Sequence, residues 1–133
     1  MPFKLTNLKF FQDERGSLIP LELNRNLPFD LRGAFYVVNF PKGAIRGRHA
    51  HTRIIEAVIA LCGVLEVKLL DKAGEHILSL DSPFKGLIVY PVTWIELKSL
   101  SENSVFLVCM NDLYDDNEVI KNFEDFINII HKK

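Results

Sequence analysis

The sequence predicts an all-β domain, a sandwich or barrel of short strands that ends in one amphipathic helix. Short apolar or alternating segments follow one another at intervals of about ten residues, and turn residues separate them. A helical period of three to four residues is confined to the end of the chain. Because 133 residues can close one hydrophobic core, we expect a single domain over residues 1–133.

The expected strands of the first half are bounded by turns. Strands at 5–11 and 17–22 flank the turn at 13–16, and a strand at 33–40 ends at the turn 41–43. Shorter apolar segments predict strands at 47–51 and 54–62. Strands at 63–70 and 75–80 flank the turn at 71–74. In the first of these, Leu65, Val67 and Leu69 alternate with charged residues, as in a strand with one wet face.

The second half continues this spacing and then changes period. Strands are expected at 86–90, 93–99 and 104–110. Acidic residues at 115, 116 and 118 suit a helix N-terminus. We therefore predict a helix over about 117–131, packed on the outside of the β domain, because apolar residues recur there every three or four positions: Val119, Ile120, Phe123, Phe126, Ile127 and Ile130.

Composition narrows the function classes. The net charge is −1, so no basic field favours nucleic acid as a partner. Apolar runs stop well short of the roughly 18–20 residues that span a bilayer, so we expect no membrane interaction. The N-terminal residues lack a secretory pattern, and a cytoplasmic location is the expectation.

Two histidines, His49 and His51, form the most reactive feature of the sequence. Side chains two residues apart on a strand point to the same face, so both imidazoles would stand on one inward surface. Such a pair can bind a metal or move protons. Both interpretations are open at the level of the residues.

A longer spacing surrounds this pair, namely Gly43-x5-His49-x-His51-x4-Glu56-x6-Gly63. It resembles the first motif of the cupin superfamily, which implies a double-stranded β-helix, or jelly roll. In metal-binding cupins the two histidines and the glutamate are ligands, together with a histidine from a second motif. The matching region at 86–96 contains no histidine. A metal site would thus have three protein ligands, His49, His51 and Glu56.

A closer resemblance covers nearly the whole chain. Four motifs occur in order: Arg46-Gly47-x-His49-Ala50-His51, Leu80-Asp81-Ser82-Pro83-x-x-Gly86-Leu87, Trp94-x-Glu96 and Asp112-Leu113-Tyr114-Asp115. In these the chain is similar to the WxcM-like sugar 3,4-ketoisomerases. The resemblance implies isomerisation of dTDP-4-keto-6-deoxyglucose to its 3-keto isomer, without metal or other cofactor. It also implies a homodimer that exchanges N-terminal strands, and a place in the synthesis of deoxyamino sugars for surface polysaccharide such as O-antigen or S-layer glycan.

The same resemblance implies roles for individual residues. His49 and His51 are the expected catalytic pair, with His51 as the base at C3 and His49 in proton transfer between the sugar oxygens, or the reverse. Tyr36 is expected to hydrogen-bond O4 of the sugar. Arg46 would meet sugar or diphosphate oxygens. Trp94, Glu96 and Glu56 complete the expected substrate-binding set.

Three further positions qualify the resemblance. The chain has Ile95 where the family usually has histidine, and Glu56 where it usually has glutamine. The carboxylate of Glu56 would raise the pKa of a neighbouring histidine. Arg15, in Asp13-Glu14-Arg15-Gly16, matches an arginine that helps to hold nucleotide phosphate in dTDP-4-dehydrorhamnose 3,5-epimerases. It could act across a dimer interface or simply belong to a charged turn. The alternatives to an isomerase are a metal-binding cupin enzyme and a non-catalytic nucleotide-sugar binding module.

Overall fold

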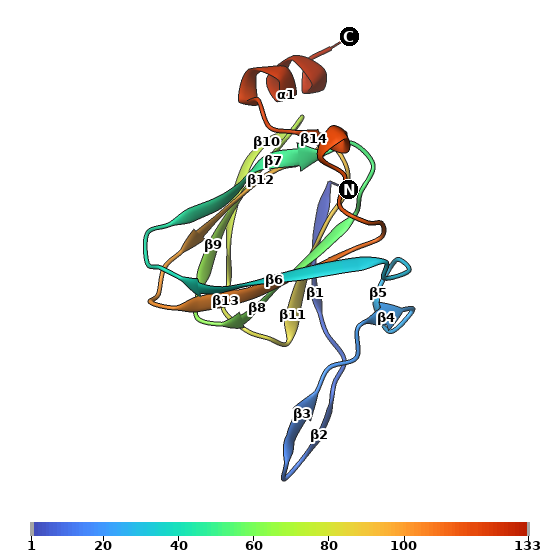
Figure 1. Cartoon of the computed structure of the whole chain (residues 1–133), viewed down its shortest axis with the longest axis vertical. Helices are drawn as coiled ribbons and strands as arrows, with labels where there is room; N and C mark the ends of the chain where they lie inside the picture. The colour runs from blue at the N-terminus through green and yellow to red at the C-terminus, as the bar shows by residue number, and fades with distance from the viewer. Residues whose placement is uncertain (1, 133) are drawn as a thin grey trace.

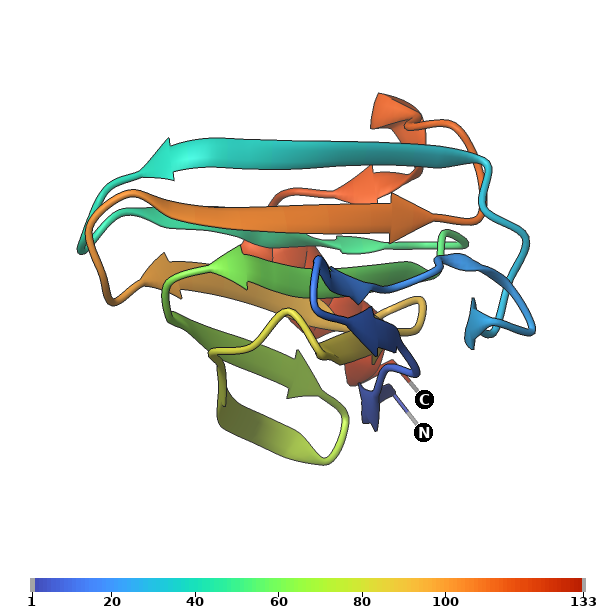
Figure 2. The same cartoon turned by 90° about the horizontal axis from the view of Figure 1, so that it is seen from below.

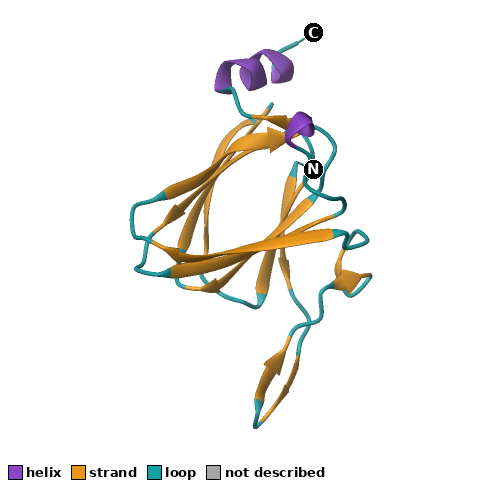
Figure 3. Ribbon diagram, in the orientation of Figure 1, coloured by secondary structure: helices purple, strands orange, loops and turns teal. Residues whose placement is uncertain are grey.

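The computed structural model describes residues 2–132, so the two end residues of the expected domain 1–133 lie outside the described residues. Residues 2–132 form two five-stranded antiparallel sheets that face each other, with a short α-helix beyond one sheet (Figures 1 and 3). The prediction of an all-β jelly roll with a C-terminal helix is confirmed. In the described residues no helix is long and apolar enough to cross a membrane.

The first sheet places strands from both halves of the chain side by side, as Figure 2 shows. Its order is β1 (Phe3–Asn7), β11 (Lys85–Val89), β8 (Glu56–Cys62), β13 (Ser104–Met110) and β6 (Gly33–Phe40). The second sheet has the order β10 (Gly74–Leu80), β9 (Leu65–Asp71), β12 (Trp94–Ser99), β7 (Ile45–His51) and β14 (Val119–Ile120).

The main core lies between the two sheets. Leu65, Val67 and Leu69 of β9 are fully buried there, which confirms the alternation expected for this strand. They belong to one cluster with Val58 of β8 and Phe106 of β13 from the opposite sheet. At one end of the sandwich β7 and β8 carry buried polar side chains, namely His51 and Glu56.

The N-terminal strands are more broken than predicted. In place of strands at 5–11 and 17–22, the chain forms β1, the hairpin β2 (Phe11–Asp13) and β3 (Gly16–Leu18), and the short pair β4 (Glu22–Leu23) and β5 (Asn26–Leu27). The hairpin projects from the body of the molecule (Figure 1). Since β1 pairs with β11, and within residues 2–132 the strands of the hairpin pair only with each other, the strand must end between β1 and β2.

The C-terminal helix α1 spans Phe123–Ile130 and begins six residues later than predicted. Residues Asp116–Glu118 form a 3-10 turn, η1, and β14 then pairs with the edge of β7. The β-branched residues Val119 and Ile120 fit a helical period, but a strand edge was available to them. The helix itself starts where the Asn122 side chain accepts a hydrogen bond from the Asp125 amide. Its buried face covers Trp94 and Ala50 of the second sheet.

Candidate active site

A cavity of about 360 Å³ opens between the two sheets at the end that carries the histidines. Its walls come from β6, β7, β8, β12 and β13, and from the segment after β13. Phe35, Val37, Ile95 and Phe106 contribute apolar surface. The polar groups come mainly from β7 and the C-terminal segment: Arg46, Arg48, His49, Glu56, Tyr114 and Lys121.

A distortion in β7 sets the direction of the histidines. Gly47 and Arg48 both have left-handed backbone, with φ of 89° and 58°, and the pairing with β12 shifts register at Ile95–Glu96. A Cβ on Gly47 would lie 2.9 Å from the Ile95 carbonyl oxygen, so this position requires glycine. Such a bulge re-aims the side chains that follow it.

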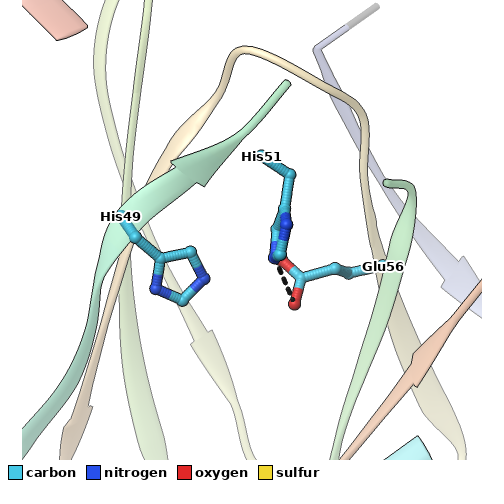
Figure 4. Close-up of side chains that lie close together, drawn as sticks. All are labelled: His49, His51 and Glu56. Atoms are coloured by element: carbon cyan, nitrogen blue, oxygen red, sulfur yellow. Dashed lines mark ion pairs between the residues drawn. The ribbon is translucent and has the colours of Figure 1, made fainter. Parts of the chain in front are cut away.

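His49 and His51 point inward from β7, and Glu56 reaches toward them from β8 (Figure 4). The two rings lie 5.0 Å apart and nearly perpendicular, at 84°. Nε2 of His51 is 3.3 Å from a carboxylate oxygen of Glu56. The predicted pair is therefore brought together, and Glu56 does face the site.

His49 is the unpaired member of the cluster. Its Nε2 is buried and has no hydrogen-bond partner among the described residues. Burial lowers the pKa of His49 below its ordinary 6.5, and this effect outweighs the nearby charge of Glu56. His49 is thus a neutral imidazole with a free ring nitrogen on the cavity wall.

His51 is held between two carboxylates. Its Nδ1 contacts Glu118 and its Nε2 faces Glu56, and the residue is only 4% exposed. Burial opposes its charged form, but the contacts with Glu56 and Glu118 outweigh burial and raise the pKa of His51 above 6.5. The backbone is tied as well, because the Val92 amide donates to the His51 carbonyl at 2.7 Å.

Glu118 is a site residue that sequence reasoning missed. The sequence places Glu118 in the first turn of the expected helix, where a glutamate needs no partner. In the structure it is buried at the end of η1, and the contact with His51 lowers its pKa against the effect of burial. The β-branched pair Val119-Ile120, which is separated from the Asn122 cap by Lys121 alone, is the available signal that the helix begins later.

Trp94 and Glu96 do not reach the cavity, contrary to the prediction. Trp94 packs on the outer face of β12 against Phe123 and Phe126, and its indole N–H donates to Glu96 at 3.0 Å. Alternation along the strand turns Ile95 inward instead, where it lies opposite His49. The motif Trp94-x-Glu96 thus lies on the face of the second sheet against which helix α1 packs.

Tyr36 and Arg15 also lie outside this cavity. Phe35 and Val37 occupy the inward positions of β6, so Tyr36 points to the outer face and is 70% exposed. The contact of Tyr36 with the sugar at this cavity is therefore not supported. Arg15 is at the tip of the β2–β3 hairpin and pairs with Asp13 at 2.6 Å. Of the arginines predicted from sequence, only Arg46 lines the cavity.

His49, His51 and Glu56 could also act as ligands of a metal ion. One nitrogen from each histidine and a Glu56 oxygen lie within 4.8 Å of one another, a spacing that a transition metal could bridge. Both nitrogens of His51, however, already face carboxylates, and the arrangement serves equally to hold and exchange protons.

Comparison with known proteins gives a consistent family. Residues 1–131 match the family model described as "FdtA: WxcM-like, C-terminal". A TDP-4-oxo-6-deoxy-alpha-D-glucose-3,4-oxoisomerase of Aneurinibacillus thermoaerophilus is 34% identical over 132 residues, which cover 99% of this chain and 95% of that protein.

Solved structures agree with this match. QdtA, a sugar 3,4-ketoisomerase from Thermoanaerobacterium thermosaccharolyticum solved in complex with TDP, superposes with a TM-score of 0.93 at 30% identity. The match covers 98% of this chain and 96% of that chain. A 3,4-ketoisomerase from Helicobacter canadensis gives a TM-score of 0.94 at 30% identity, with 99% of both chains covered.

Proposed function

Because this chain belongs to the FdtA family of WxcM-like proteins, we propose that it is a sugar 3,4-ketoisomerase that converts a TDP-linked 4-keto-6-deoxy sugar to its 3-keto isomer. The observation that carries the proposal is the neutral, unpaired His49 on the cavity wall, with the carboxylate-bound His51 buried beside it. A base and an acid are the two groups that this reaction needs.

The reaction requires two balanced proton transfers. A proton leaves C3, and its electrons form the C3–C4 double bond of an enediol while O4 takes up a proton. A proton then returns to C4 as O3 loses its own, which leaves the carbonyl at C3. No electron acceptor is consumed, so the substrate and the side chains of this site are sufficient.

His49 suits the carbon-to-carbon transfer. It is neutral because burial lowers its pKa, and its Nε2 lone pair has no partner among the described residues. Ile95, which lies opposite it on β12, supplies an apolar wall. We assign His49 as the base that takes the C3 proton and returns it to C4, which is the second of the two role assignments that the sequence leaves open.

His51 suits the oxygen-to-oxygen transfer. Its carboxylate contacts favour the imidazolium, which can donate to O4 and accept from O3. The Nε2 to Glu56 separation of 3.3 Å exceeds the about 2.7–2.9 Å of a tight charge-assisted bond, so this proton stays available to a substrate oxygen. Glu56 keeps the charge on the ring and lines the cavity itself.

The basic rim of the cavity suits the nucleotide diphosphate. Arg46 and Arg48 of β7 line the cavity next to His49, and Lys121 adds an ammonium from the C-terminal segment. One guanidinium group can donate two parallel hydrogen bonds to two oxygens of a phosphate, which orients the phosphate as well as binding it. We assign these groups to the diphosphate and leave Tyr114, at the same rim, to the sugar.

The exposed apolar surface supports a homodimer with exchanged N-terminal strands. The projecting β2–β3 hairpin exposes Phe11 and Leu18, and a lone two-stranded hairpin is marginal in water. On the outer face of the first sheet, Tyr36 and Val38 are also exposed. In such a dimer Arg15 would reach the partner's diphosphate. Light scattering should give twice the chain mass, and a monomer mass would contradict this part of the proposal.

The product also suggests where the enzyme acts. A 3-keto sugar is the substrate that an amino transfer at C3 consumes, which supports a role in deoxyamino-sugar synthesis for surface polysaccharide such as O-antigen or S-layer glycan. A cytoplasmic location completes this proposal. Gene deletion followed by analysis of the cell's glycans would test it, and an unchanged glycan composition would refute the pathway.

Deuterium exchange tests the reaction directly. The protein is incubated with dTDP-4-keto-6-deoxyglucose in deuterated water and followed by NMR. We expect exchange at C3 and a new 3-keto species. If the nucleotide sugar binds and neither signal changes, the chain is a binding module. Metal analysis of untagged protein addresses the cupin alternative, since stoichiometric metal required for turnover would overturn the metal-independent mechanism.

A further inference from the structure

Glu118 is a buried carboxylate that the reaction scheme above does not use directly. It comes from η1, 67 residues after His51 in the chain, and its side chain is 5% exposed. We infer that Glu118 is the positioning residue of the site: it fixes the ring of His51 and places a proton on Nδ1, so that Nε2 is the nitrogen that faces Glu56 and the substrate.

The main chain holds one oxygen of Glu118. Its Oε2 accepts hydrogen bonds from three consecutive amides, those of Thr52, Arg53 and Ile54, at 3.0, 3.1 and 3.3 Å. Converging amides favour a carboxylate over a carboxylic acid. Glu118 therefore stays ionised, and its second oxygen is an acceptor only.

That second oxygen, Oε1, meets Nδ1 of His51. Because an ionised carboxylate cannot donate, Nδ1 must carry the hydrogen. The neutral form of His51 is then the Nδ1–H tautomer, and the second proton is gained and lost only at Nε2. A histidine with the opposite tautomer could not deliver a proton to the sugar oxygens from Nε2 and recover it there.

The pairing of β14 with β7 fixes the position of Glu118 relative to His51. In β14, Val119 pairs with His51 and Ile120 pairs with Ala50, so Glu118 directly precedes the residue that faces the histidine. Helix α1 then anchors the segment, with Phe126 fully buried. On the other side, Arg53 binds Asp112 at 2.5 Å and Asp115 at 3.4 Å.

The other titratable groups around His51 do not replace Glu118. His49 lies beside it on β7, and Glu56 faces Nε2 from β8. Glu118 is the group at Nδ1 among the described residues. Removing it leaves that nitrogen with no acceptor among residues 2–132.

Histidine nitrogen NMR on the whole protein tests the inference without any turnover, and kinetics then follow. This kinetic arm rests on the proposed isomerase function, whereas the NMR arm does not. In the unsubstituted protein, at a pH above the pKa of His51 where its ring is neutral, we expect the Nδ1–H tautomer. In Glu118→Gln the amide can donate to Nδ1, so we expect the Nε2–H tautomer to gain. We also expect kcat to fall roughly 10- to 100-fold with little change in KM.

Two further variants serve as controls for the Glu118→Gln result. Glu118→Asp keeps the charge and should retain the Nδ1–H tautomer and part of kcat. Glu124→Gln removes an exposed carboxylate of α1 and should change neither the tautomer nor kcat. An Nε2–H tautomer in the unsubstituted protein overturns the inference, even if Glu118→Gln fails to fold. A lost kcat with an unchanged His51 tautomer overturns it too, since Glu118 would then be merely structural.

Discussion

Replacing Glu56 with glutamine should shift the alkaline limit of activity while leaving activity at lower pH largely intact. Glutamine keeps the size and a hydrogen-bonding oxygen, but it removes the charge 3.3 Å from Nε2 of His51. Because Glu56 is among the groups that raise the pKa of His51, the variant histidine loses its proton at lower pH. The rate should depend on pH through two groups: it rises as His49 loses its proton below 6.5 and falls as His51 loses its proton above 6.5.

The size of the expected pKa shift of His51 follows from its 3.3 Å contact with Glu56. Unit charges at this distance attract by roughly 5 kcal/mol at an effective dielectric constant of about 20. Lost solvation cancels much of that, so a hydrogen bond to a charged group contributes about 1.5–3 kcal/mol net. On the descending limb, Glu56→Gln should therefore have roughly 10- to 100-fold less protonated His51, and a correspondingly lower rate, than the unsubstituted enzyme.

Exchange at C3 in deuterated water, measured across the pH range, is the assay. The matched control is Glu66→Gln on β9, which removes a carboxylate that faces away from the cavity and should leave the profile unchanged. If Glu56→Gln leaves the alkaline limit where it was, His51 is not the acid of the reaction. A rate lost equally at every pH would instead place Glu56 in direct contact with the reacting atoms.

Three further substitutions test other parts of the site. His49→Gln should abolish exchange at C3 yet leave TDP binding intact by calorimetry; residual exchange near the original rate would remove His49 as the base. Gly47→Ala should cost about 1–2 kcal/mol in urea unfolding because φ is positive there, and it should lower kcat by moving His49; an unchanged kcat would separate the bulge from catalysis. Phe126→Ala should cost about 3–5 kcal/mol, since Phe126 is fully buried under α1, and a cost below 1 kcal/mol would mean that the helix contributes little.

Strand positions were the part of the fold that local pattern could predict. The strands at 33–40 and 104–110 have the predicted bounds, and β9 and β10 are within one or two residues. Turn residues mark these ends, and alternation marks the buried face. The N-terminal hairpin was less predictable, because its exposed Phe11 and Leu18 look like core residues in the sequence.

Which face of a strand lines the cavity was beyond the sequence. Spacing shows that Trp94 and Glu96 share a face and that Ile95 takes the other. It does not show that helix α1 covers the first face and the cavity adjoins the second. The same ambiguity affected Tyr36, since either parity of β6 offers an aromatic side chain to the interior. The packing of helix α1 on the second sheet decides the face of Trp94 and Glu96, and the packing of the two sheets against each other decides the face of Tyr36.

The histidine pair shows how position along one strand separates two identical side chains. His49 lies where β7 pairs with β12, and the neighbour it meets there is the apolar Ile95. His51 lies where β12 pairing has ended and β14 has begun, so loop amides and the C-terminal segment can bring Glu118 to its Nδ1. The pKa of one imidazole is thereby lowered by burial and the pKa of the other is raised by its carboxylate neighbours, two residues apart. His49 and His51 take different roles because the strand that pairs with β7 changes from β12 to β14 between them. The His-x-His spacing in the sequence does not contain this information.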